Sequence, residues 1–173
     1  MPFEPTREQV DRATDAIVKV LRDLGLSCCL VGGVACTAYG MTRTPHDVDM
    51  IVMGWEYDEE DLKQRVTAMN PAFYTLPSQD PSATYRVLFY RFPDTGGISY
   101  STTHKCKVDL LLPKDATAMR IPTVPVDRMW QNTSHNPPFP LMPPLPTLLL
   151  KLQAWQDHRE SDKIHFHDKL PQD

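Results

Sequence analysis

Two aspartates separated by a single valine, Asp47 and Asp49, are the residues of this chain best suited to chemistry. They stand at the head of a run in which polar and apolar residues alternate, which is the period of a β-strand. Residues i and i+2 of a strand project from one face, so both carboxylates are expected to point to one place. Like charges held so close are costly unless a cation lies between them. Mg²⁺, which prefers oxygen ligands, is the natural compensation.

A third carboxylate comes from a later apolar run, "HKCKVDLLL", which we expect to be a strand over His104–Leu112. Asp109 shares one face of that strand with Lys105 and Lys107. The opposite face is apolar and carries Cys106, Val108, Leu110 and Leu112. An aspartate in such a strand needs a polar partner or a metal. We therefore expect Asp109 to complete the site and to orient or deprotonate an attacking hydroxyl.

A diglycine, Gly32-Gly33, follows the apolar run Ser27–Val31, which is expected to be a buried strand, and opens a short helix expected over Val34–Tyr39. Glycines at such a junction let backbone N–H groups approach a phosphate closely. The N-terminus of the helix adds partial positive charge there. Taken alone, the diglycine could be a plain tight turn and the aspartates a solvated strand edge. Together, a phosphate cradle and a carboxylate pair are typical of metal-assisted phosphoryl or nucleotidyl transfer.

The segment "VGG" followed by "DVDMIV" resembles the nucleotidyltransferase superfamily. The family pattern is a hydrophobic residue, Gly-Gly or Gly-Ser, about a dozen residues, and then Asp-hydrophobic-Asp/Glu-hydrophobic, with a third acid on a later strand. The loop "YGMTRTPHD" is similar to that of stand-alone members, which often read Gly-x-x-Arg-x-Thr/Ser before the acidic pair. Two positions depart from the pattern. Gly33 stands where the family often has serine, and Pro45 stands where many relatives have a polar residue.

The resemblance is densest from Leu30 to Val52 and extends to Val108–Leu112. It implies two Mg²⁺ ions and a nucleoside triphosphate, by default ATP, with a hydroxyl acceptor on a small molecule, a protein or an RNA end. The final helix also resembles, over fewer matching residues, the closing region of abortive-infection nucleotidyltransferase toxins, in which a lysine faces the triphosphate. The implied metal ligands and catalytic residues are Asp47, Asp49 and Asp109, and the implied nucleotide-binding residues are Gly32, Gly33, Arg43, Thr44 and Lys151.

The expected fold is α/β (α+β), with a nucleotidyltransferase-like mixed β-sheet flanked by helices and a C-terminal helix after a proline-rich strap. We expect a single domain over 1–173, with a core at 1–135, the strap at 136–146 and the C-terminal helix and tail at 147–173. A first helix should open at Thr6, where Gln9 gives a capping-box spacing, and end at Gly25. A later helix from Asp58 begins with four acids, which we interpret as a solvated face.

The strap, "NPPFPLMPPLP", has six prolines in eleven residues, which excludes a central strand or a helix interior. It is expected to deliver an apolar helix, Leu148–Trp155, whose core-facing side chains would be Leu148, Leu149, Leu152 and Trp155. The alternative is a ligand for an SH3-type module, through Pro137–Pro140 or Pro140–Pro143. Beyond the helix, His165 and His167 could bind zinc, although a solvated tail is the simpler interpretation.

The charge and hydrophobicity of the chain limit the kinds of partner and the cellular location that we expect for it. The formal net charge is -4 and the isoelectric point is about 5.8, which makes extended nucleic-acid binding unlikely on electrostatic grounds. No apolar stretch is long enough for a membrane span, and the first residues lack the pattern of a signal peptide. We expect a cytoplasmic or nuclear protein that is not secreted, whose four cysteines are small buried hydrophobes. A different class of function remains open, namely a catalytically idle nucleotidyltransferase-fold protein that binds a nucleotide or a protein partner.

Overall fold

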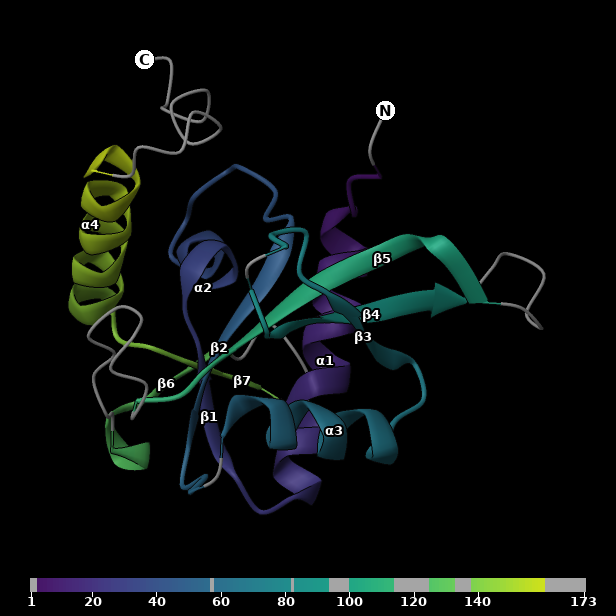
Figure 1. The fold of residues 1–173 in the computed structure, drawn as a ribbon. Helices are drawn as coiled ribbons and strands as arrows, with labels where there is room; N and C mark the ends of the chain where they lie inside the picture. The colour runs from purple at the N-terminus through teal and green to yellow at the C-terminus, as the bar shows by residue number, and fades with distance from the viewer. Residues whose placement is uncertain are drawn as a thin grey trace.

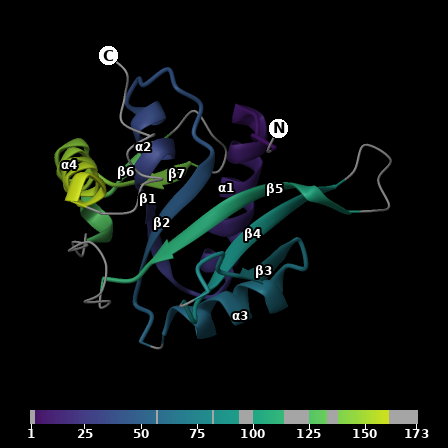
Figure 2. The ribbon, with the colours of Figure 1, turned by 45° about the horizontal axis from the view of Figure 1, so that its top comes forward.

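The computed structural model describes residues 3–56, 58–81, 83–93, 100–113, 125–132 and 138–160. Over these ranges the chain forms a mixed seven-stranded sheet flanked by helices (Figures 1 and 2). In chain order the elements are α1 (Arg7–Asp23), β1 (Ser27–Leu30), α2 (Gly32–Ala38), β2 (Asp47–Met53), α3 (Glu59–Met69), β3 (Phe73–Pro77), β4 (Arg86–Pro93), β5 (Tyr100–Leu111), the 3-10 turn η1 (Val126–Arg128), β6 (Trp130–Asn132), β7 (Phe139–Leu141) and α4 (Pro144–Glu160). The expected fold class is confirmed, although the strands β3, β6 and β7 were not expected.

The strand order across the sheet is β3-β4-β5-β2-β1-β7-β6. The pairs β2–β5 and β1–β7 are parallel, and the other neighbours are antiparallel. The two strands that carry the three aspartates, β2 and β5, are therefore adjacent in the middle of the sheet. The diglycine follows β1, the next strand over, so the topology brings all the expected site segments together.

Helix α1 begins as the sequence predicts. The Thr6 hydroxyl accepts from the Gln9 N–H, and the Thr6 N–H donates to Gln9 Oε1, which together form the capping box. Its apolar face packs into the main core against the inward residues of β2 and β5. That face consists of Val10, Ala13, Ile17, Val18, Val20 and Leu21.

A second, smaller core lies on the other face of the sheet. Alternation along β2 sends Val48, Met50 and Val52 to the main core, while Ile51 and Met53 enter the second. The rest of the second core is Cys29, Val31, Met129, Met142 and Leu150. Asp47 and Asp49 project on the same side as Ile51, so the carboxylates stand on the face that the strap and α4 partly cover. Figures 1 and 2 show α4 beside the β1–β7–β6 end of the sheet, apart from α1 and α3.

The proline-rich strap contains a strand, so the expectation that it could not form one inside a sheet is wrong. β7 includes Pro140 yet pairs with β1 on one side and β6 on the other. Three residues suffice because the flanking side chains of Phe139 and Leu141 are buried, and the Met142 N–H donates to Leu30 O. Pro140 therefore lies within a paired strand, which favours a structural strap over an SH3-type ligand at Pro140–Pro143. Pro137 lies outside the described residues.

Helix α4 begins at Pro144, earlier than the expected start at Leu148, because prolines are tolerated in a first helical turn. The predicted core face is wrong, since its four members are between 46% and 56% exposed: Leu148, Leu149, Leu152 and Trp155. Leu150, at 8% exposed, is buried instead. The Thr147 hydroxyl bonds to Met142 O and Pro143 O, which fixes the rotation of the helix on the strap.

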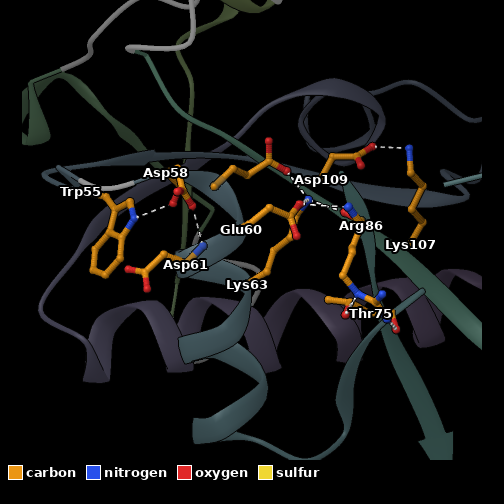
Figure 3. A network of polar contacts seen from close by, with 10 residues as sticks. Trp55, Asp58, Glu60, Asp61, Lys63, Thr75, Arg86, Lys107 and Asp109 are labelled. Atoms are coloured by element: carbon orange, nitrogen blue, oxygen red, sulfur yellow. Dashed lines mark hydrogen bonds and ion pairs between the residues drawn. The ribbon is translucent and has the colours of Figure 1, made fainter. Parts of the chain in front are cut away.

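The acidic start of α3 is more than a solvated face. Lys63 is only 3% exposed, and its ammonium forms ion pairs with Glu59 at 2.7 Å and Glu60 at 2.8 Å. It also donates to Arg86 O, and the Arg86 N–H donates to Glu60 Oε1 (Figure 3). Two of the four acids thus join α3 to β4 around a buried lysine.

The four cysteines are free; Cys28, Cys29 and Cys106 are buried as expected, whereas Cys36 is partly exposed. Burial raises the pKa of Cys28 to about 11 and that of Cys106 to about 12, which leaves both as neutral thiols.

Among the described residues, no helix combines the length and hydropathy that a membrane span requires. The division of the chain at 135 and 146 stays a prediction, and His165 and His167 lie outside the described residues.

Candidate active site

The parallel register of β2 and β5 assembles four charged side chains. In this register Asp47 on β2 lies opposite Lys107 on β5, and Asp49 lies opposite Asp109. Because side chains in register on parallel strands share a face, these residues form a charged quartet on one side of the sheet. One carboxylate oxygen from each of the three aspartates lies within 4.8 Å of the other two. The structure therefore brings together all three residues that the sequence singled out as carboxylate ligands.

Gly32 lies directly against this quartet. It is the first residue of α2, with φ at +60°, a conformation that side-chain-bearing residues rarely adopt. A β-carbon built on it would overlap the Asp49 carboxylate and would lie 2.6 Å from Asp49 Cγ. The Val31 N–H also donates to Asp49 O at 3.0 Å. The glycine is thus required by the close approach of the carboxylate, a reason that sequence reasoning about phosphates did not supply.

The electrostatics of the quartet are those of crowded like charges. Burial, together with the charges of Asp47 and Asp109, raises the pKa of Asp49 to about 6. The charges of Lys151 and Lys107 act in the opposite direction. Lys151 is an exposed residue of α4.

Lys107 is the site residue that sequence reasoning missed. Its ammonium lies 2.7 Å from Asp109 Oδ2, with the two side chains 43% and 31% exposed (Figure 3). Burial lowers the pKa of Lys107, but the charge and hydrogen bond of Asp109, with the charges of Asp47 and Asp49, outweigh it and raise that pKa. The available signal was its position two residues before Asp109 on the same strand face.

Two further predicted residues lie in the loop between α2 and β2, where Arg43 is exposed and Thr44 partly exposed. In the described part of the chain, no ion pair joins Arg43 to any aspartate of the quartet. Gly33 faces Pro45 in that loop instead, because a β-carbon on Gly33 would lie 2.9 Å from Pro45 Cβ.

The three carboxylates fit a divalent cation. They converge from two strands, they are partly exposed, and oxygen is the donor that Mg²⁺ and Mn²⁺ take. Burial, and after it the charges of Asp47 and Asp109, raise the pKa of Asp49, and the lysine in contact with Asp109 does not offset them. A bound cation would relieve the repulsion among the carboxylates.

The fold is similar to that of a solved structure. The chain is similar to the crystal structure of an antigenic nucleotidyltransferase-like protein from Paracoccidioides brasiliensis, with a TM-score of 0.63. The match covers 91% of this chain and 71% of that one at 14% sequence identity. The chain therefore has a nucleotidyltransferase-like fold, as its sequence motifs indicated. No family model matches the sequence, and no curated protein matches it either.

Proposed function

We propose that the protein is a Mg²⁺-dependent nucleotidyltransferase, which transfers a nucleoside monophosphate from a triphosphate to a hydroxyl acceptor. The observation that carries the proposal is the convergence of three carboxylates, within 4.8 Å, on adjacent strands of a nucleotidyltransferase-like fold. A fold alone is compatible with many functions, so the proposal depends mainly on these three converging carboxylates.

In the proposed reaction the acceptor oxygen forms a bond to the α-phosphorus, and the bond from that phosphorus to the bridging oxygen breaks, releasing pyrophosphate. Asp47, Asp49 and Asp109 would hold two Mg²⁺ ions. These ions would supply charge neutralisation on the reacting phosphate oxygens. Asp109, the carboxylate contributed by the second strand, would orient the acceptor hydroxyl or accept its proton. Positioning and electrostatic stabilisation would provide most of the rate.

The triphosphate would lie over the start of α2. The N-cap residue of that helix, Val31, forms no side-chain hydrogen bond to it, so the backbone at Gly32 and Gly33 is left to bind phosphate oxygens. Lys151 would add positive charge from α4, in line with its influence on Asp49. Arg43 and Thr44 would contribute from the loop before β2 when nucleotide is bound. ATP is the default nucleotide.

The acceptor is a hydroxyl on a small molecule, a protein or an RNA end. A net charge of -4 disfavours a long nucleic acid, whose binding depends on many basic contacts. We place the reaction in the cytoplasm or nucleus.

The alternative function is a catalytically idle relative that binds a nucleotide or a protein partner. The observation in its favour is the exposed apolar side of α4, formed by Leu148, Leu149, Leu152 and Trp155. The three aspartates speak against it, because a pure binding protein has no need to hold three carboxylates so close together.

The deciding experiment measures thermal unfolding with each of the four nucleoside triphosphates, with and without Mg²⁺. A ligand at 100 times its dissociation constant adds about 2.7 kcal/mol of stability, which is easily seen. Wild type is compared with Asp47→Asn and Asp49→Asn, and Asp23→Asn, an exposed acid at the end of α1, controls for the loss of charge. A shift that requires Mg²⁺ and is lost in the two site variants supports the proposal. Pyrophosphate release with offered acceptors then separates an enzyme from an idle binder.

A further inference from the structure

We propose that Lys107 is an internal counterion that occupies Asp109 in the metal-free protein and is displaced when a metal ion binds there. The inference rests on the proposed function and adds a regulatory property to the same site. Lys107 would set the metal affinity of one carboxylate, and through it the order in which the metal positions fill.

Lys107 and Asp109 are in direct contact. The Lys107 ammonium lies 2.7 Å from Asp109 Oδ2, the length of a charge-assisted hydrogen bond (Figure 3). Mg²⁺ binds its oxygen ligands at about 2.0–2.1 Å, closer still. An ammonium and a metal ion on the same carboxylate repel each other, so a metal that uses Asp109 competes with the Lys107 ammonium.

The three carboxylates differ in whether a lysine already contacts them. Within the described ranges, Asp109 is the only aspartate of the quartet that forms an ion pair. Asp47 has Lys107 as its strand neighbour in register, but the ammonium turns toward Asp109 instead. An ion held by Asp47 and Asp49 alone could therefore bind without disturbing this contact, whereas an ion that also uses Asp109 competes with Lys107 for that carboxylate.

The side chain of Lys107 is able to move. It is 43% exposed, so its displaced ammonium can be hydrated rather than stranded in a dry interior. A partly exposed ion pair of this kind is weak enough for a divalent ion to break. The pair thus lowers metal affinity without abolishing it.

Lys105 provides a matched control on the same strand. It lies two residues before Lys107 on the same face and carries the same charge, but its ammonium lies over the Phe89 ring, 4.3 Å from the centroid. Removing either lysine changes the net charge equally. Of these two lysines, Lys107 is the one that contacts a carboxylate of the quartet.

The test titrates Mn²⁺ into the nucleotide-free protein and follows free Mn²⁺ by electron paramagnetic resonance. We expect Lys107→Gln to tighten Mn²⁺ binding about fivefold, the scale of one weak ion pair, and Lys105→Gln to change it less than twofold. Lys107→Arg, which keeps the charge, should bind like wild type. Lys107→Met, which keeps the apolar stem, serves as a second neutral variant if Lys107→Gln is poorly folded.

A double-mutant cycle separates direct competition from the general loss of a positive charge. In an Asp109→Asn background, Lys107→Gln should have no larger effect than Lys105→Gln, because the carboxylate for which Lys107 competes is gone. An equal effect of the two lysine variants in the wild-type background would overturn the inference, as would a Lys107→Gln effect that persists unchanged without Asp109. Neither result would touch the proposed function, provided that Asp49→Asn abolishes Mn²⁺ binding. If wild type binds no Mn²⁺, or Asp49→Asn binds it normally, both the inference and the proposed function fail.

Discussion

A β-carbon placed on Gly33 would lie 2.9 Å from Pro45 Cβ, closer than such atoms approach in folded proteins. Gly33 is the second residue of α2, and Pro45 is buried in the loop that leads into β2. These are the two positions at which the sequence departs from the nucleotidyltransferase pattern. In the structure the two departures are adjacent, since the proline ring occupies space next to the position where that pattern often has a serine side chain.

Replacing Gly33 by alanine should therefore destabilise the protein. Helix propensity alone predicts the opposite, a gain of up to about 1 kcal/mol for alanine over glycine in a helix. The overlap with Pro45 should instead cost about 1–3 kcal/mol, the usual range for overpacking in a filled interior. Chemical denaturation of the two proteins measures the sign directly.

The double variant Gly33→Ala with Pro45→Gly tests whether Pro45 is the cause. With no proline side chain, the alanine has room, so most of the cost of Gly33→Ala should disappear in the Pro45→Gly background. Additive losses would show that Gly33 is required for a reason other than this contact.

Gly32→Ala should disrupt the site rather than the fold as a whole. The new methyl would overlap the Asp49 carboxylate and add the cost of a side chain at φ +60°, about 1 kcal/mol or more. We expect Mn²⁺ affinity to fall at least tenfold, because Asp49 must leave its position. Gly25→Ala is the control, since Gly25 has a similar φ of +73° but nothing within 4 Å of the added carbon. It should lose comparable backbone stability while binding Mn²⁺ normally, and weakened binding in both variants would contradict the role given to the Gly32–Asp49 contact.

Asp49 should make a contribution that lowers the stability of the metal-free protein as pH rises from about 4 to about 6. The pKa of Asp49 is raised in the folded state to about 6 by burial and by its neighbours' charges, above the unfolded value near 3.9. Over that window Asp49 binds its proton more tightly in the folded protein than in the unfolded chain, so its contribution to stability is most favourable below pH 4 and is lost as pH rises through 6. The Asp49 contribution amounts to at most about 3 kcal/mol.

Asp49→Asn isolates this contribution, because asparagine does not titrate. Urea denaturation at a series of pH values should show a steeper decline for wild type than for the variant between pH 4 and pH 6. Mn²⁺ affinity should change in the opposite direction and strengthen with rising pH, since the ligand must be deprotonated. Parallel stability curves for the two proteins would contradict a raised pKa at Asp49.

The common face of Asp47 and Asp49 could be predicted because strand alternation has a period of two and depends on local sequence alone. The convergence of Asp109 with them depends on the pairing of β5 with β2, which strand alternation does not give. The contact of Lys107 with Asp109 could not be chosen over one with Asp47, because it depends on a side-chain torsion and on the register of β2 with β5. The strand at Pro140 escaped prediction for a related reason, since its pairing is decided by the burial of its neighbours.

The rotation of α4 is the clearest failure of periodicity, and it leads to a test by substitution. Leucines at 148, 149, 150 and 152 surround much of the helix, so the pattern cannot say which of them faces the sheet. In the structure Leu150 is buried in the second core with Cys29 and Met142, whereas Leu152 is 52% exposed. Leu150→Ala should cost about 2–4 kcal/mol through lost burial and a cavity, while Leu152→Ala should stay within about 0.5 kcal/mol of wild type. The two variants remove the same atoms from the same helix, so the difference in their unfolding free energies measures burial alone. A larger loss at Leu152 than at Leu150 would mean that α4 packs with the face that the sequence first suggested.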